Sequence, residues 1–256
     1  MRHTCLSLSA AIVMAGAVVA PAPVIAETAK APHWSYEGEA GPDHWGELAE
    51  AFETCRTGTK QSPIDVKSAT RISGSELKIK YANGPKEIVN NGHTIQANIQ
   101  PGDTLTVDGK TYDLVQFHFH TPSENHIGGR GYPMELHFVN KASDGSLAVV
   151  AVMIKEGTAN SDLSAIFAKT PKSGATPVSI SDRKFDMSEL LPANREHFRF
   201  SGSLTTPPCT EGVTWLVMAH PITASKAEIG KFKTFYPHNA RPLQSSTGRQ
   251  ITEYSK

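Results

Sequence analysis

Apolar and polar residues alternate in most segments of the chain from about Glu76 onward. Successive side chains of a β-strand point to opposite faces of a sheet, so this alternation predicts strands with one buried face. Asn-Gly, Gly-Pro and Pro-Gly-Asp sequences separate several of these segments and are typical of turns. One segment is apolar almost throughout, 146–155, and predicts a buried central strand. The predicted strands are 76–82, 86–91, 93–99, 103–107, 111–120, 134–140, 146–155 and 213–220.

Two further segments predict helices, 161–169 and 225–235. In the second, Ser225 and Glu228 have the spacing of a capping box. The strands follow one another too closely for helical crossovers between parallel neighbours. Residues 31–59 carry aromatic, glycine and proline residues without periodicity and predict an irregular segment. The pattern therefore predicts a mainly β (α+β) single domain, with a large, mostly antiparallel, twisted central sheet and peripheral helices.

The first 26 residues predict a secretory signal peptide that is not part of this fold. Arg2 precedes an apolar run from about Leu6 to Ala20, and Val24 and Ala26 are placed as small residues before a cleavage site. The run is short for a membrane span, and an uncleaved anchor is the alternative. We therefore expect a mature domain of residues 27–256, periplasmic or secreted, with no membrane association.

Composition and cysteine usage agree with an exported globular protein. The 256 residues include 25 basic and 25 acidic side chains, so charge gives no case for nucleic acid or an anionic membrane as the partner. Removal of the signal peptide removes Cys5 and leaves Cys55 and Cys209. In an oxidising compartment these two most simply form a disulfide. Two buried free thiols are the alternative.

Histidines gather in the predicted strands 111–120 and 134–140. His118 and His120 alternate with phenylalanines, so both imidazoles point to one face of their strand. His137 lies on the next predicted strand, which can return beside the first. Three imidazoles converging from neighbouring strands predict an open zinc site. Gln116 and Glu135 each lie two residues before a candidate ligand and could bind the second ring nitrogen of that ligand.

Several motifs, in their order along the chain, resemble those of the α-class carbonic anhydrases of the bacterial exported type. The resemblance runs from His33-Trp34 through Asn239-Ala240-Arg241-Pro242, nearly the whole mature chain. It implies the same fold and a Zn²⁺ ion bound by His118, His120 and His137. It also implies reversible hydration of CO₂ to bicarbonate and a proton, by attack of zinc-bound hydroxide on CO₂. The motifs are QSPIDV, VNNGH, QFHFH, SEN, ELHFV and SLTTPP followed by VTW.

The same resemblance implies catalytic roles for Thr205 and Glu124. Thr205 accepts the hydrogen bond of the hydroxide, and Glu124 fixes the direction of the threonine proton because a carboxylate only accepts. Thr206 lies beside substrate or product. The resemblance also suggests a cis bond in Pro207-Pro208. The implied apolar pocket for CO₂ consists of Val139, Val149, Leu204, Val213 and Trp215.

A histidine with a pKa near the working pH can carry the proton to buffer, and His93 matches the shuttle of the family. Tyr36 and Asn91 match polar groups that order the intervening water. Gln96 stands where many relatives carry asparagine, which predicts a different water network.

Two other classes of function remain open from the sequence. HFHTPSENHIGGRG also resembles the first metal motif of cupins, in which Glu124 would be a ligand, but Tyr112 occupies a position where that motif expects glycine. A non-catalytic, carbonic-anhydrase-like zinc-binding domain is the third hypothesis, although such relatives typically lose ligand histidines. His126 matches a structural histidine and is not assigned to the metal. A homodimer is left open.

Overall fold

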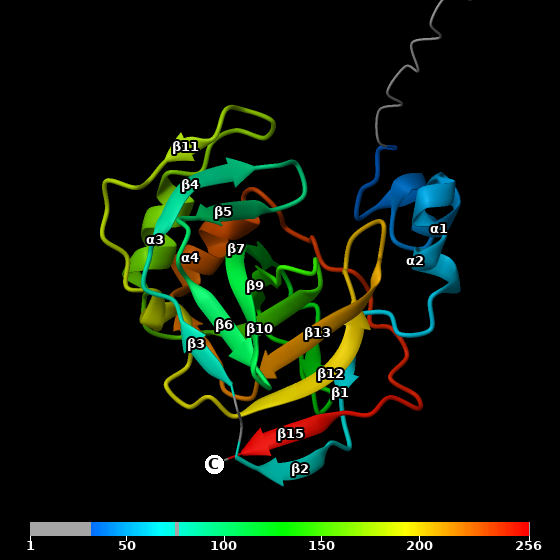
Figure 1. Ribbon diagram of the computed structural model, residues 1–256. Coiled ribbons are helices and arrows are strands. Elements are labelled where there is room, and N and C mark those ends of the chain that lie inside the picture. Colours follow the sequence, from blue (N-terminus) through cyan, green and yellow to red (C-terminus); the bar gives the residue numbers. More distant parts are fainter. Residues whose placement is uncertain (1–31, 75–76, 256) are drawn as a thin grey trace, which may run out of the picture. The chain divides into compact units, whose positions relative to one another are not determined.

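A 13-stranded sheet dominates the computed structural model, which describes residues 32–74 and 77–255 (Figure 1). Its strand order is β11-β4-β5-β7-β9-β10-β13-β12-β15-β2, with β3, β6 and β14 paired beside this path, and β1 and β8 form a separate pair. The strands are β1 Asp65–Val66, β2 Thr70–Ser73, β3 Lys78–Lys80, β4 Pro85–Asn90, β5 Ile95–Ile99, β6 Thr104–Val107, β7 Lys110–His120, β8 His126–Ile127, β9 Met134–Lys141, β10 Leu147–Glu156, β11 Val178–Ser179, β12 His197–Ser203, β13 Glu211–Met218, β14 Ile222–Ala224 and β15 Thr252–Ser255.

The predicted fold class is confirmed, with mostly antiparallel pairing. Eight strands, β3 to β7, β9, β10 and β13, overlap the eight predicted segments. The prediction missed β12 although Phe198 and Phe200 alternate there, and it missed the less apolar β2 and β15. It also did not foresee that β13 runs parallel to β10, with Trp215 opposite Val149.

The helices are few and short. Both predicted helices are present, and the capping box of α4 is formed, with Ser225 and Glu228 each binding the other's backbone amide. The N-terminal part was predicted to be irregular, which is wrong in part, because four short helical turns lie between Gly38 and Thr57. The helices are η1 Gly38–Ala40, α1 Trp45–Leu48, η2 Glu50–Phe52, α2 Thr54–Thr57, α3 Ser161–Ala168, η3 Met187–Leu190 and α4 Lys226–Lys233.

The main core lies between one face of the sheet and helices α3 and α4. Phe117 and Phe119 of β7 are fully buried in it. The ring of Phe119 contacts Phe167 of α3 at 5.1 Å and Phe232 of α4 at 5.9 Å between centroids. Truncating a buried ring of this kind costs about 3–5 kcal/mol in protein cores. Because strand side chains alternate, this packing turns His118 and His120 toward the other face.

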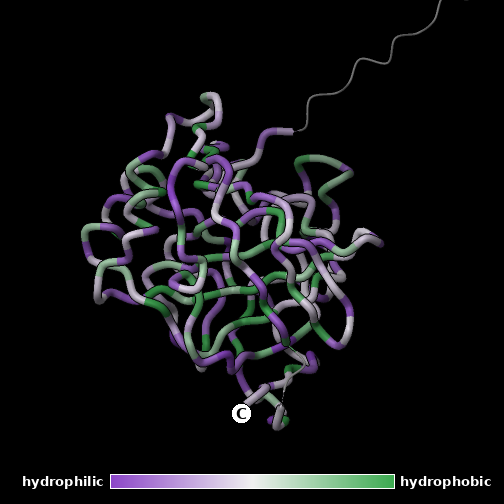
Figure 2. The backbone as a smooth tube through the Cα atoms, turned by 60° about the vertical axis from the view of Figure 1, so that its left-hand side comes forward, coloured by the Kyte–Doolittle hydropathy of each residue, from purple (hydrophilic) through white to green (hydrophobic). Residues whose placement is uncertain are grey.

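The middle strand of the sheet is as apolar as predicted. In β10 every residue from Ala148 to Ile154 is buried, because neighbouring strands flank it and other parts of the chain cover both faces. Figure 2 shows hydrophobic segments crossing the middle of the fold and segments of mixed hydropathy in the outer loops.

The predicted signal peptide 1–26 lies outside the described residues. Pro32–Lys256 forms one compact unit by its contacts. Within 32–74 and 77–255, no helix has the length and apolar character needed to cross a membrane.

Candidate metal centre

Three histidines converge on the face of β7 and β9 opposite the main core. His118 and His137 are direct cross-strand partners in the antiparallel pairing of these strands. His120 lies two residues further on the same face of β7. One ligand nitrogen from each residue lies within 4.8 Å of the other two. The predicted three-histidine cluster is therefore confirmed.

Each imidazole has a polar group beside its second ring nitrogen. Nδ1 of His118 lies 2.8 Å from Oε1 of Gln116. Nε2 of His137 lies 3.0 Å from Oε1 of Glu135, within ion-pair distance but without the geometry of a hydrogen bond. Both partners were predicted. The partner of His120 was missed: its Nδ1 lies 2.7 Å from the backbone carbonyl of Asn239, 119 positions away. Such partners select the tautomer and hold the remaining nitrogen toward a metal.

The donor set fits a metal ion such as Zn²⁺. Burial lowers the pKa of all three imidazoles, those of His118 and His137 well below the ordinary histidine value. They are therefore neutral near pH 7, as ligands must be. His120 is 1% exposed, and its Nε2 has no hydrogen-bond partner among the described residues. A buried polar atom without a partner is costly, and a metal at this point would satisfy it.

Asn125, in the connection after β7, holds Glu135 in place. Its backbone amide donates to Oε2 of Glu135 at 2.7 Å, and its side-chain amide donates to Oε1 at 2.8 Å. Both residues are fully buried. Sequence reasoning quoted the SEN motif but did not assign Asn125. A buried carboxylate only accepts hydrogen bonds, so it needs donors such as these two around it.

Glu124 lies beside the histidines and contacts the loop that carries Thr205. Its Oε1 accepts the backbone amide of Arg241 at 2.9 Å. Burial raises the pKa of Glu124 to about 8, and the Arg241 amide and the nearby Thr205 hydroxyl oppose the rise. A divalent cation at the histidines would lower this pKa, because opposite charge favours the carboxylate.

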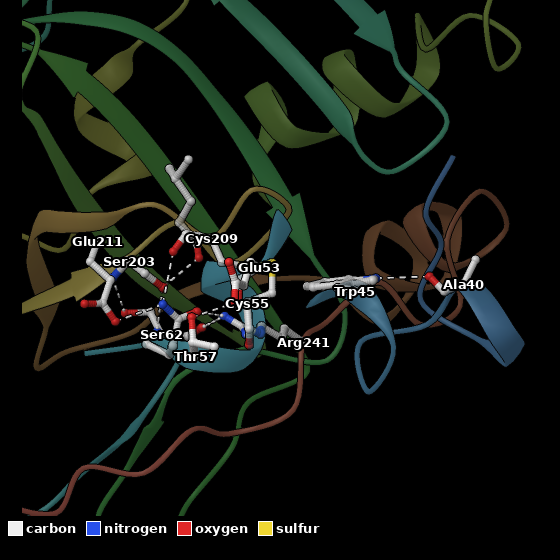
Figure 3. The surroundings of a disulfide bond; sticks show 12 residues. Ala40, Trp45, Glu53, Cys55, Thr57, Ser62, Ser203, Cys209, Glu211 and Arg241 are labelled. Carbon is white, nitrogen blue, oxygen red and sulfur yellow. Dashed lines mark hydrogen bonds between the residues drawn. A yellow bond between two sulfur atoms is a disulfide. The ribbon is translucent and has the colours of Figure 1, made fainter. Parts of the chain in front are cut away.

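The guanidinium of Arg241 links residues 55–62 to this site. It donates to Oε1 of Gln61 and the carbonyl of Ser62, both at 2.8 Å, and to the carbonyl of Cys55 at 3.0 Å (Figure 3). Gln61 in turn donates to the carbonyl of Cys209 at 3.0 Å. Sequence reasoning noted Arg241 only within a motif, because partners so distant in sequence leave no local pattern.

The predicted disulfide between Cys55 and Cys209 is confirmed, so the free-thiol alternative is wrong (Figure 3). It links α2 to the loop that follows β12, with a Cα–Cα distance of 5.0 Å and a sequence separation of 154. Thr205 and Thr206 lie in this loop, four and three residues before Cys209. The Pro207–Pro208 bond is cis, in agreement with the resemblance. The cross-link thus tethers the loop that places Thr205 against Glu124.

The loop is also fixed where it leaves β12. Ser203 and Ser62 exchange hydrogen bonds between backbone amides and hydroxyls, at 2.9 and 3.2 Å. A Cβ at Gly202 would lie 2.2 Å from Oγ of Ser62 and 2.8 Å from Cδ1 of Trp215. Only glycine allows this close approach.

An apolar cluster borders the histidines on one side. It brings together all five residues assigned to the CO₂ pocket, with Val149, Val213 and Trp215 buried and Val139 and Leu204 partly buried. The Trp215 ring contacts His137 at 5.0 Å between centroids. Val139 follows His137 by two residues on the same face of β9. The alternation of side chains along the strand therefore places this apolar residue next to the metal ligand.

A cavity of about 140 Å³, lined mostly by polar residues, borders the histidines on the other side. All four residues assigned to the proton path line this polar cavity, and sequence reasoning missed two further lining residues, Trp34 and Thr94. The cavity is lined by Trp34, Tyr36, Asn91, His93, Thr94, Gln96, Gln116, His118, His120 and Thr206.

His93 is held by its turn and by a ring stack. Oδ1 of Asn91 accepts the backbone amides of His93 and Thr94, both at 2.9 Å. The His93 ring stacks on Trp34 with 3.7 Å between centroids and 8° between planes. Burial, and more weakly the charge of His33, lowers the pKa of His93. Asn91 therefore positions His93, in addition to lining the cavity.

Comparisons with known proteins agree with this site. Residues 40–255 match the family described as eukaryotic-type carbonic anhydrase. A carbonic anhydrase from Pectobacterium carotovorum is 46% identical over 226 residues, which cover 86% of this chain and 90% of that protein. The solved α-carbonic anhydrase of Photobacterium profundum is 48% identical with a TM-score of 0.81, over 86% of this chain and 100% of that one. That of Thermovibrio ammonificans, in complex with the inhibitor sulfanilamide, is 38% identical with a TM-score of 0.83, over 87% and 100%.

This chain belongs to the family of eukaryotic-type carbonic anhydrases and is a carbonic anhydrase with a three-histidine metal site. The family membership removes the cupin hypothesis. Glu124 is correspondingly outside the group of ligand atoms within 4.8 Å, which contains His118, His120 and His137. His126 lies on β8, paired with Asp65 of β1, and is not part of the group.

Proposed function

We propose that this protein catalyses the reversible hydration of CO₂ to bicarbonate and a proton, with Zn²⁺ bound by His118, His120 and His137. The observation that carries the proposal is the position of the three imidazoles, two buried and that of His118 partly buried, at the border between an apolar wall and a polar cavity. CO₂ hydration needs both, because the substrate is apolar and the proton must leave through polar groups.

Zn²⁺, when bound, would act as a Lewis acid that makes hydroxide available from water near neutral pH. The chain itself supplies orientation. The Thr205 hydroxyl donates its proton to Glu124, so its oxygen lone pairs face the attacking oxygen and accept a hydrogen bond from it. Thr206 lines the cavity beside His118 and His120, where bicarbonate would form.

The apolar wall would bind CO₂ by shape and exclusion of water. Val139, Val149, Leu204, Val213 and Trp215 offer few polar groups, so ordered water gains little there. An apolar gas displaces such water at low cost.

His93 would carry the proton from the cavity to buffer. Its partly exposed ring lines the cavity, and an imidazole both accepts and releases a proton near neutral pH. Tyr36, Asn91 and Gln96 line the same cavity and would order the water between the metal and His93.

The N-terminal segment 1–26 supports export to the periplasm or beyond, with 27–256 as the mature catalytic domain. The disulfide between Cys55 and Cys209 agrees with an oxidising compartment.

Stopped-flow CO₂ hydration on the purified protein tests the proposed function, together with its zinc content. We expect activity to disappear on treatment with a strong chelator and to return with Zn²⁺. A folded protein that contains zinc but does not accelerate hydration would favour the non-catalytic zinc-binding domain. The intact contact between Thr205 and Glu124 argues against that alternative.

A further inference from the structure

A chain of hydrogen bonds runs from the active-site cavity to β4, the strand next to the short edge strand β11. Nε2 of Gln96 donates to Oδ1 of Asn98 at 2.7 Å. Nδ2 of Asn98 donates to Oε1 of Glu87 at 2.8 Å. Gln96 and Asn98 share one face of β5, and Glu87 is the cross-strand partner of Asn98 on β4. Of the three, only Gln96 lines the cavity.

The chemistry of these groups gives the chain one direction. The Glu87 carboxylate can only accept, so Asn98 must present its Nδ2 to it. Oδ1 of Asn98 then faces Gln96, which must present its Nε2 in turn. The carbonyl oxygen of Gln96 takes no part in this chain of hydrogen bonds and is free to accept a hydrogen bond in the cavity. Reversing either amide would set two acceptors against each other.

A second amide of opposite direction lines the same cavity. Oε1 of Gln116 is 2.8 Å from Nδ1 of His118. With the metal on the other ring nitrogen, Nδ1 carries the proton, and Gln116 accepts it. The side-chain NH₂ group of Gln116 is then left to donate a hydrogen bond. A water between the two side chains would therefore accept from Gln116 and donate to Gln96.

We propose that Glu87 and Asn98 are positioning residues, which hold the Gln96 amide with its carbonyl toward the cavity and so set the polarity of the water network serving His93. This inference rests on the proposed function, since it assigns a part in the proton path. Glu87 touches neither substrate nor metal and acts only through Asn98 and Gln96.

Reversing the terminal group tests the direction. Lysine only donates, so Glu87→Lys forces Asn98 to present Oδ1 to it and Nδ2 to Gln96, which turns the Gln96 carbonyl away from the cavity. In the double variant E87K/N98D this reversal cannot occur. The aspartate that replaces Asn98 accepts from both neighbours, so Gln96 again donates through Nε2 and the original direction is restored. Glu87→Gln can take either direction and should lie between wild type and Glu87→Lys.

¹⁸O exchange between CO₂ and water separates the two stages of the reaction. It gives the rate of CO₂–bicarbonate interconversion and, separately, the proton-dependent rate of water release. We expect Glu87→Lys to lower water release about 2- to 10-fold, the range of one net hydrogen bond, without an equal loss of interconversion. The double variant E87K/N98D should recover most of the wild-type rate of water release. Equal losses in both rates, or no loss, would overturn the inference.

Glu50→Lys provides the matched control, because Glu50 is exposed and does not line the cavity. High salt separates direction from charge, since screening weakens a charge effect and leaves a hydrogen-bond direction intact. A Glu87→Lys defect that disappears in high salt would count against the inference.

NMR provides a readout that needs no activity. In wild type one side-chain amide proton of Gln96 should exchange slowly with water, because it donates to Asn98, and Glu87→Lys should abolish this protection. Unchanged protection would show that Glu87 does not set the direction of the Gln96 amide, which would overturn the inference. Failure of the proposed function looks different: the zinc-containing wild-type protein would then not catalyse ¹⁸O exchange between CO₂ and water at all, whatever the Gln96 amide does.

Discussion

The active-site face of the sheet has two halves, the polar cavity and the apolar wall. Neighbouring strands of one sheet form both, but the two halves require different properties of their side chains. One cross-strand row runs through Glu87, Asn98, Gln116, Val139 and Val149, from polar residues on β4 and β5 to the apolar wall on β10. The polar end works through hydrogen bonds whose partners and directions are fixed. The apolar end requires only side chains of suitable size that exclude water. Polar function is therefore sensitive to single atoms, and apolar function to size.

The largest effect is expected at Thr205, which lies where the two halves meet. Thr205→Ala removes a preorganised hydrogen-bonding group at the reacting centre and should lower kcat/KM for CO₂ about 10²- to 10³-fold. Thr205→Ser keeps the hydroxyl and should retain most activity. Stopped-flow hydration measures both variants. A fully active Thr205→Ala would remove Thr205 and Glu124 from the mechanism.

Filling the apolar half should damage substrate binding alone. Val139→Tyr would occupy the wall beside His137 and should lower kcat/KM roughly 10²-fold, the scale of steric discrimination in apolar pockets. Val139→Ala keeps the space open and should lose far less. The rate of proton-dependent water release should change little. A pronounced loss of water release would show that the halves are not separable.

Damage to the polar half should have the complementary signature. His93→Ala should lower kcat roughly 10-fold in weak buffer, less than a typical proton-transfer contribution because buffer and water still take up the proton, and leave kcat/KM nearly unchanged. Added imidazole should restore kcat, because it replaces the missing carrier. Loss of kcat/KM, or no rescue, would contradict the shuttle role.

The smallest effect is a shift of the pH profile. Burial is the larger cause of the lowered pKa of His93, and repulsion by His33 is the smaller. The Trp34 ring stacks on His93 and covers one of its faces. Trp34→Ala should therefore raise the His93 pKa toward its ordinary value, and His33→Ala should raise it less. The midpoint of proton transfer should move to higher pH in step, since the shuttle accepts a proton only when neutral. NMR titration of His93 checks the direction, and a lower pKa in Trp34→Ala would contradict it.

The sequence by itself determined the features that depend on strand or helix period. The two-residue spacing of His118 and His120 places them on one face, as does that of Gln116 with His118 and Glu135 with His137. The capping box at Ser225 is local in the same way. These relations hold for any strand or helix, so they could be derived without the fold.

Only the tertiary structure decided which distant segments complete the site. The Asn239 carbonyl at His120, the Arg241 amide at Glu124 and the parallel pairing of β13 with β10 join residues far apart in the chain. The short helical turns before Thr57 have no periodic pattern in the sequence either, whereas β12 does alternate and was simply overlooked. A backbone carbonyl or amide is present at every residue except for proline's missing N–H, so the sequence does not mark which one will be used. Non-local packing makes that choice.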